Sequence, residues 1–185
     1  DDLLDAVQWA IDKGVTAQDR VAVMGLSYGG YSTLVSLSFT PDRFQCGVDL
    51  AGPSNLTRLI GAMPDWWTWQ RPQFVNRVGD PSTKEGAADL MRRSPIARVD
   101  AISKPLLVTN GADDPRIFPD QSQEIVDAMR ARGKPVTYAF YPDEGHVYAK
   151  DTTNISFAAI AEHFLSKCLG GPAEPYGNDL AGSRV

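Results

Sequence analysis

The chain has 185 residues, 43% hydrophobic and 22% charged, a balance typical of one soluble globular domain. Its formal net charge of -5 argues against nucleic-acid and membrane partners, because binders of nucleic acid and of anionic membrane surfaces carry basic patches. No apolar stretch reaches the roughly 18 residues of a membrane span, and no signal peptide is visible. Because the first residue is Asp1 and not a methionine, the sequence constrains the cellular location only weakly; a cytoplasmic location is the one we expect.

The first quarter of the chain predicts helices and strands in alternation. Residues 3–13 form a short amphipathic pattern that ends at Gly14, as a helix would. Residues 21–25 are a continuous apolar run, typical of a strand that is buried on both faces of a parallel sheet. A helix rich in small residues is expected from about 28 to 39, and a second strand over 44–50.

The middle of the chain is irregular before the alternation resumes. Residues 51–100 show only short helical pieces and an aromatic cluster, followed by a third strand over 105–109. Asp120 is expected to cap the next helix, with Gln123 in the capping-box position and Gly133 at its end.

The last part predicts a fourth strand over 136–141 and a final helix over 153–169. Alternating strands and helices indicate an α/β fold, in which right-handed crossovers build a parallel sheet with helices on both faces. We therefore expect one folded unit over 1–170 and a loop-like tail over 171–185.

The two cysteines, Cys46 and Cys168, are too few and too far apart for a disulfide framework or a metal site. We expect both to be buried free thiols, since unpaired cysteine often behaves as a small core hydrophobe. With only two histidines and no Cys/His cluster, neither a metal nor another cofactor is expected.

The strongest motif is the pentapeptide Gly25-Leu26-Ser27-Tyr28-Gly29, directly after the first predicted strand. A G-x-S-x-G at a strand-to-helix corner can hold a serine on a strained, exposed turn, where it acts as a nucleophile. The flanking glycines are expected to keep side chains away from it. The alternative is that Ser27 is only the N-cap of the following helix.

A serine nucleophile needs a base and a group that orients the base. His146 follows the fourth predicted strand and Asp114 follows the third, so both are expected at the same sheet edge as Ser27, in the order that accompanies a nucleophile elbow. The alternatives are a loop histidine without a role and rival residues elsewhere. His163 lies mid-helix, Asp113 has almost the same spacing as Asp114, and Asp49 ends a strand, where a turn or cap role is favoured.

These motifs resemble those of the prolyl oligopeptidase family of serine peptidases, over about residues 1–170. The nucleophile region of the family is similar to Gly25-Leu26-Ser27-Tyr28-Gly29-Gly30-Tyr31, its acid loop to Gly111-Ala112-Asp113-Asp114-Pro115-Arg116-Ile117, and its histidine loop to Tyr141-Pro142-Asp143-Glu144-Gly145-His146. In the family the orienting aspartate stands two residues before an arginine, so the resemblance selects Asp114 over Asp113. It also implies the α/β-hydrolase fold.

The resemblance implies further roles. The backbone N–H of Tyr28 would donate to the oxyanion. Arg116 would bind a substrate carbonyl, unless it is a surface arginine or pairs with Asp113. Trp66 and Trp67, with Trp69, would line an apolar specificity pocket, unless the cluster only packs.

This sequence also departs from the family. Asn110 stands where the family commonly has histidine, outside the proposed triad. The earlier strands of the hydrolase domain, which supply the second oxyanion donor, and the usual β-propeller are missing. We therefore expect the C-terminal portion of such a domain, with weak activity on its own. The nucleophile strand would then be an unpaired edge that pairs with the missing N-terminal segment or with a second copy as a homo-oligomer.

The resulting hypothesis is a serine peptidase that cleaves short peptides through an acyl-enzyme, with Ser27, His146 and Asp114 as its triad. A carboxylesterase acting on acyl esters with the same triad is the first alternative. A fragment with little activity, serving as an assembly module, is the second.

Overall fold

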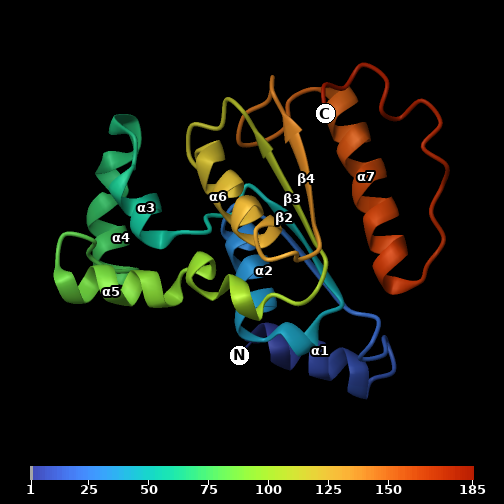
Figure 1. The fold of residues 1–185 in the computed structure, drawn as a ribbon, viewed down its shortest axis with the longest axis horizontal. Helices are drawn as coiled ribbons and strands as arrows, with labels where there is room; N and C mark the ends of the chain where they lie inside the picture. The colour runs from blue at the N-terminus through green and yellow to red at the C-terminus, as the bar shows by residue number, and fades with distance from the viewer. Residues whose placement is uncertain (1) are drawn as a thin grey trace.

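The computed structural model describes residues 2–185, which form a parallel sheet with helices on both faces (Figure 1). The α/β architecture expected from the sequence is confirmed. All neighbouring strands are parallel, and their order in space is their order along the chain. The strands are β1 (Ala22–Leu26), β2 (Cys46–Leu50), β3 (Leu106–Gly111) and β4 (Val136–Tyr141).

Three helices cover one face of the sheet and one covers the other (Figure 1). Apolar residues of α1 (Asp2–Asp12), α2 (Tyr28–Phe39) and α6 (Pro119–Arg130) pack with β1, β3 and β4 in the larger core. The long helix α7 (Asp151–Leu169) packs alone on the opposite face, against β2, β3 and β4.

The remaining helices are short and lie in the segment between β2 and β3. They are α3 (Leu56–Gly61), α4 (Arg71–Arg77) and α5 (Lys84–Arg93), with the short 3-10 helices η2 (Asp65–Gln70) and η3 (Pro95–Ala101); another, η1 (Pro41–Arg43), precedes β2. Figure 1 shows α3, α4 and α5 beside the sheet and not over it. Their own apolar cluster reaches the sheet region through Tyr31 and Ile117.

The first strand is less buried than its apolar sequence predicts. Within the described chain β1 is an edge strand, and Met24 and Leu26 are 51% and 43% exposed. The prediction of burial on both faces was wrong because α7 contacts the neighbouring strands and leaves this face of β1 open. The expectation of an unpaired edge agrees with this order.

The start of α6 also differs from the prediction. The helix begins at Pro119, whose ring fixes the φ angle that a first helical turn needs, and Phe118 is the N-cap. Asp120 therefore lies inside the first turn, where its carboxylate pairs with Arg58 at 2.8 Å. Gln123 donates to Asp127 and forms no capping box.

The two cysteines form a disulfide, which corrects the expectation of free thiols. Cys46 begins β2 and Cys168 lies in the last turn of α7, so the packing of α7 on the sheet brings their Cα atoms to 6.3 Å despite 122 residues of separation. Spacing in the sequence could not reveal this contact, because it depends on which face α7 covers.

The tail after α7 runs back along that helix without helix or strand (Figure 1). Tyr176 in the tail stacks on His163 of α7, with ring centroids 3.8 Å apart. No helix in residues 2–185 is both long enough and apolar enough to cross a membrane.

Candidate active site

Ser27 occupies a strained corner between β1 and α2. Its backbone has φ 60° and ψ -115°, a conformation that side-chain-bearing residues rarely adopt and that persists only when neighbouring structure enforces it. The enforcing contact is a hydrogen bond of 2.8 Å from the Ser27 N–H to the Leu50 carbonyl at the end of β2. Although Ser27 stands at the N-cap position of α2, its side chain accepts no capping hydrogen bond. The corner therefore has the geometry of a nucleophile elbow.

The two glycines of the pentapeptide have different reasons to be there. A Cβ on Gly25 would lie 2.3 Å from the backbone carbon of Gly29, so only glycine lets α2 pack this closely on β1. A Cβ on Gly29 would meet no atom within 4 Å. The expected crowding thus explains Gly25, and the structure gives no steric reason for Gly29.

Asp114 is held by the loop that follows β3. One carboxylate oxygen, Oδ1, accepts the N–H groups of Arg116 and Ile117 at 2.8 and 2.9 Å. The other oxygen, Oδ2, accepts from His146 Nδ1 at 2.8 Å and from Asn110 Nδ2 at 3.1 Å. With four donors around a buried carboxylate, the side chain has one defined position.

His146 lies on the loop after β4, pressed against the loop that carries Asp114. Gly111 makes this approach feasible, since a Cβ there would lie 2.2 Å from the Glu144 carbonyl oxygen. The same carbonyl accepts the Asp113 N–H at 2.9 Å. The structure therefore brings His146 together with Asp114, and turns the rival Asp113 toward solvent.

Glu144 orders the histidine loop from inside. Its buried carboxylate accepts the N–H groups of Ala149 and Lys150 at 2.7 and 3.1 Å. Burial opposes ionisation of this group, but these N–H bonds and a bond from the Thr153 hydroxyl outweigh it and lower the pKa of Glu144. The ionised carboxylate thus ties the loop to the start of α7.

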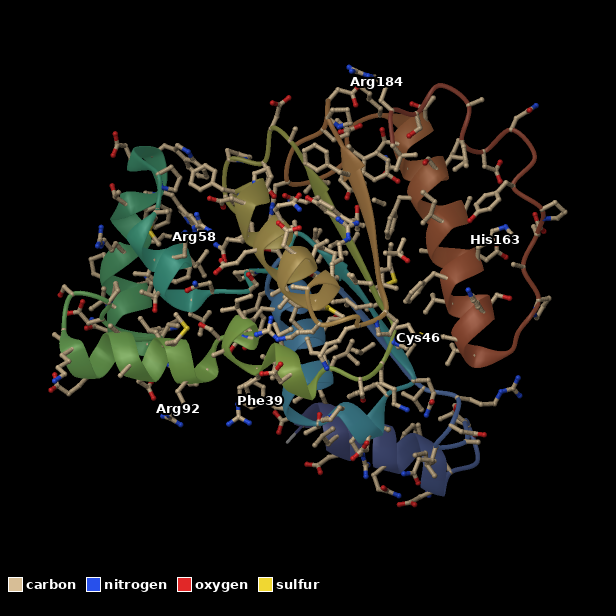
Figure 2. All side chains as sticks on the ribbon, viewed as in Figure 1. Phe39, Cys46, Arg58, Arg92, His163 and Arg184 are labelled. Carbon is tan, nitrogen blue, oxygen red and sulfur yellow. A yellow bond between two sulfur atoms is a disulfide. The ribbon has the colours of Figure 1, made fainter. Side chains whose placement is uncertain are left out.

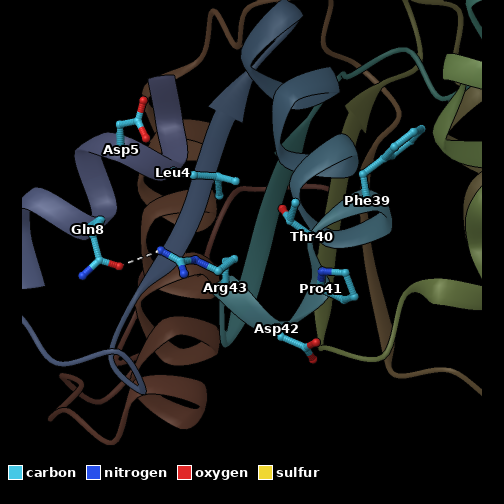
Figure 3. A pocket seen from close by; sticks show the side chains of 8 residues that line it. All are labelled: Leu4, Asp5, Gln8, Phe39, Thr40, Pro41, Asp42 and Arg43. Atoms are coloured by element: carbon cyan, nitrogen blue, oxygen red, sulfur yellow. Dashed lines mark hydrogen bonds between the residues drawn. The ribbon is translucent and has the colours of Figure 1, made fainter. Parts of the chain in front are cut away.

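Ser27 and the His146–Asp114 pair share one edge of the sheet. Leu26, directly before Ser27, and His146 line the same cavity of about 140 Å³. No hydrogen bond joins the Ser27 hydroxyl to His146 within residues 2–185; such bonds are often long without a ligand and tighten when substrate binds. A larger hollow of about 520 Å³ lies at the opposite end of the strands, between α1 and the residues before β2 (Figure 3).

Two other predicted residues lie directly beside the elbow and the acid. Tyr28 begins α2, so its N–H has no acceptor within the helix and is available to a ligand, and the residue is 77% exposed. Arg116 is exposed, and the ion pairs of the described residues do not include it. The alternative pairing of Arg116 with Asp113 is therefore not formed.

The predicted tryptophans belong to η2, in the helical segment beside the sheet. Trp66 is half exposed and stacks on Trp67 at a centroid distance of 6.0 Å. Trp67 packs edge-on against Phe74 at 5.4 Å and joins the apolar cluster that also contains Tyr31. Trp67 therefore packs against its neighbours, as expected if the cluster has only a structural role, whereas Trp66 remains half open to solvent.

The rival histidine and aspartate have structural surroundings. Figure 2 shows His163 on the side of α7 that faces the tail, where it stacks on Tyr176. Asp49 is fully buried, and its Oδ1 accepts the Gly52 N–H at 2.8 Å, as expected of a turn residue. Burial raises the pKa of Asp49 to about 8, although the Gly52 bond opposes this rise.

Sequence reasoning missed two residues of the site, Glu144 and Asn110. Glu144 lies two residues before His146 and shortly before the start of a predicted helix, where backbone N–H groups need acceptors. An acidic residue at that position could have been predicted to accept them. In the sequence Asn110 stands out only as a departure from the family pattern. Its contact with Asp114 follows from the turn after β3, which the sequence does not specify.

Comparisons with known proteins agree with this fold. The sequence matches the prolyl oligopeptidase family over residues 1–172. It is 54% identical over 185 residues to dipeptidyl aminopeptidase BIII of Pseudoxanthomonas mexicana, covering 100% of this chain and 27% of that protein. It is 46% identical over 176 residues to dipeptidyl peptidase family member 6 of Caenorhabditis elegans, covering 95% of this chain and 24% of that one.

Among solved structures, a puromycin-hydrolyzing peptidase of Mycobacterium tuberculosis superposes with a TM-score of 0.82 at 26% identity, over 92% of this chain and 25% of the other. An acylaminoacyl peptidase of Pyrococcus horikoshii gives a TM-score of 0.80 at 22% identity over 94% and 28% of the two chains, which supports the fold alone. The chain spans about a quarter of the length of the curated relatives above. The family match over nearly the whole sequence, on a parallel sheet with a serine elbow, means that this chain belongs to the prolyl oligopeptidase family.

Proposed function

We propose that this chain carries the catalytic centre of a serine peptidase, with Ser27 as nucleophile, His146 as general base and Asp114 as the group that orients the base. The observation that carries the proposal is the 2.8 Å bond between His146 Nδ1 and Asp114 Oδ2, at the sheet edge where Ser27 is held at positive φ. A base whose Nδ1 donates to a carboxylate keeps its Nε2 free to accept the serine proton.

In the proposed reaction His146 takes the proton of Ser27 as the serine oxygen attacks the peptide carbonyl. The Tyr28 N–H stabilises the resulting oxyanion, and His146 returns the proton to the leaving amine. Water then hydrolyses the acyl-enzyme with His146 again as base. Asp114 stays ionised throughout and keeps the imidazole in the productive tautomer.

The proposed substrates are the N-terminal ends of short peptides, cleaved to release dipeptides. The relative at 54% identity is named a dipeptidyl aminopeptidase and the one at 46% a dipeptidyl peptidase family member, which supports this choice. Arg116, exposed and unpaired with any acid of residues 2–185, would bind a carbonyl of the acyl side. Trp66 and Trp67 would form one apolar wall for a substrate side chain.

Labelling with a fluorophosphonate tests the nucleophile. We expect the folded 185-residue chain to react faster than the denatured chain, and Ser27→Ala to abolish labelling. Equal rates for folded and denatured chain would contradict the proposal for this chain and favour an assembly module. The same measurement on a longer polypeptide containing this chain tests whether an additional oxyanion donor raises the rate.

The choice of substrate distinguishes the proposed peptidase from a carboxylesterase with the same triad. A dipeptidyl anilide and a short acyl ester are compared at equal concentration, with a single-residue aminoacyl anilide as a control for dipeptide release. Turnover of the ester without turnover of either anilide would favour the esterase.

We further propose that β1 pairs with another strand, from an upstream segment of a longer polypeptide or from a second copy. Its outer backbone groups have no strand partner in residues 2–185, and Met24 and Leu26 leave apolar surface beside them. Size-exclusion chromatography across a range of concentrations tests this, and a well-behaved monomer at high concentration would contradict it.

A further inference from the structure

We propose that Asn110 is a positioning residue that lowers the proton affinity of the Asp114–His146 pair, an inference that rests on the triad proposed above. Asn110 lies in β3 and is fully inaccessible to solvent, so a bound substrate would not touch it. It would act on the reaction only through Asp114.

The contact is specific to one carboxylate oxygen. Asn110 Nδ2 donates to Asp114 Oδ2 at 3.1 Å, and His146 Nδ1 donates to the same oxygen at 2.8 Å. An ionised carboxylate can only accept, so the amide must turn its NH₂ group toward Asp114. The orientation of Asn110 is therefore fixed by the acid.

The other end of the amide shows that this orientation has a cost. Asn110 Oδ1 is buried and has no hydrogen-bond partner within residues 2–185. A buried polar atom without a partner destabilises a fold, and a leucine of similar size would avoid that loss. The amide is thus best explained by what its donor does at Asp114.

The N–H donor of Asn110 changes how strongly the Asp114 carboxylate stabilises the protonated form of His146. An N–H bonded to a carboxylate stabilises its negative charge. Without that bond Oδ2 would be more basic and would stabilise the imidazolium more strongly, so His146 would stay protonated to a higher pH. A protonated His146 cannot accept the proton of Ser27, so the amide would keep the base available at lower pH.

Other ionisable groups surround this pair and must stay unchanged in the test. Asp113 and Arg116 belong to the loop of Asp114, Glu144 and Tyr148 to the loop of His146, and Asp49 to the strand beside β3. Beyond them, Asp120 at the start of α6 forms an ion pair with Arg58 of α3.

The test replaces Asn110 with leucine, which removes the donor, and with histidine, which restores a donor and is the residue the resembling family commonly carries here. The titration of His146 is followed by NMR, and the fluorophosphonate labelling rate is followed against pH. The chain has only two histidines, so His163→Gln assigns the signals.

For Asn110→Leu we expect the midpoint of the His146 titration and the acid limb of the labelling profile to move together to higher pH, by about half a unit to one unit. At a fixed pH on that limb, the labelling rate should fall about three- to tenfold. Asn110→His should return both toward the unsubstituted values. Unchanged midpoints in Asn110→Leu, whatever its thermal stability, would overturn the proposal and leave Asn110 a structural role at most.

The NMR titration separates this inference from the proposed function. Suppose that the unsubstituted chain is labelled no faster than Ser27→Ala, but that Asn110→Leu still shifts the His146 titration. This result would support the role of Asn110 and refute the proposed peptidase. If Asn110→Leu does not fold, Asn110→Ala, which is smaller and has no side-chain donor, is titrated instead. A midpoint like that of the unsubstituted chain would again refute the inference.

Discussion

The buried carboxyl of Asp49 makes the stability of this protein depend on pH in an unusual direction. Asp49 lies beneath the first turn of α2, where a Cβ on Gly30 would come within 2.3 Å of its Oδ1. One oxygen accepts from Gly52, and the other has no partner within residues 2–185. The substitution Asp49→Asn keeps the shape and the Gly52 bond but cannot ionise.

The sign follows from the raised pKa. In the unfolded chain Asp49 ionises near its ordinary value of 3.8, whereas in the folded chain it holds its proton to about 8, because burial disfavours the charge. The folded state therefore binds one more proton than the unfolded state between these values. The contribution of this bound proton to the unfolding free energy is fully present below pH 3.8 and is lost as pH rises through 8. Four pH units correspond to at most roughly 6 kcal/mol of unfolding free energy.

Urea unfolding followed by tryptophan fluorescence from pH 4 to pH 9 measures this loss. We expect Asp49→Asn to match the unsubstituted chain, or to be less stable, near pH 4, and to gain on it steadily up to pH 8. Asp42→Asn, which changes an exposed carboxylate of η1, is the matched control and should show no such trend. Parallel stability curves for Asp49→Asn and the unsubstituted chain would refute the reasoning.

Three further outcomes are expected. Asp114→Asn should slow fluorophosphonate labelling by about 10⁴-fold, because an amide supports the wrong imidazole tautomer; labelling within tenfold of the unsubstituted rate would argue against the triad. Glu144→Ala should lower the unfolding free energy by roughly 3 kcal/mol at pH 7, since it removes a charged acceptor of loop N–H groups. The stabilisation by Glu144 should fade as pH falls through its lowered pKa, and unchanged urea midpoints for Glu144→Ala would contradict it. The double variant Cys46→Ser/Cys168→Ser should lose about 5 kcal/mol by loop entropy over 122 residues, whereas two thiols titrating in the oxidised native chain would show that no bridge forms.

The sequence predicted those features that local pattern determines. The apolar runs predicted all four strands, and the loops after three of them predicted that Ser27, Asp114 and His146 share one sheet edge. The elbow itself followed from the pentapeptide, because a glycine two residues before the serine leaves room for the following helix to pack closely on the strand.

Features that depend on packing in three dimensions were not predictable. The Cys46–Cys168 bond and the exposure of Met24 depend on where α7 lies across the sheet. Asp113 and Asp114 have nearly equal spacing, and the hydrogen bond from the Asp113 N–H to Glu144 is what turns Asp113 outward. Asn110 reaches Asp114 through a turn whose conformation no single residue reveals.

The helical segment between β2 and β3 has a consequence for how such a protein can evolve. It leaves the sheet at one strand end and returns at the start of the next, so its length and composition can vary without shifting the register of any strand. Its apolar cluster nevertheless includes Tyr31 and Ile117, which neighbour the elbow and the acid loop. Under the proposed function, changes in the sequence of this segment would alter the substrate preference and leave the proposed triad in place. Tyr31 and Ile117 are the positions where compensating substitutions should accumulate first.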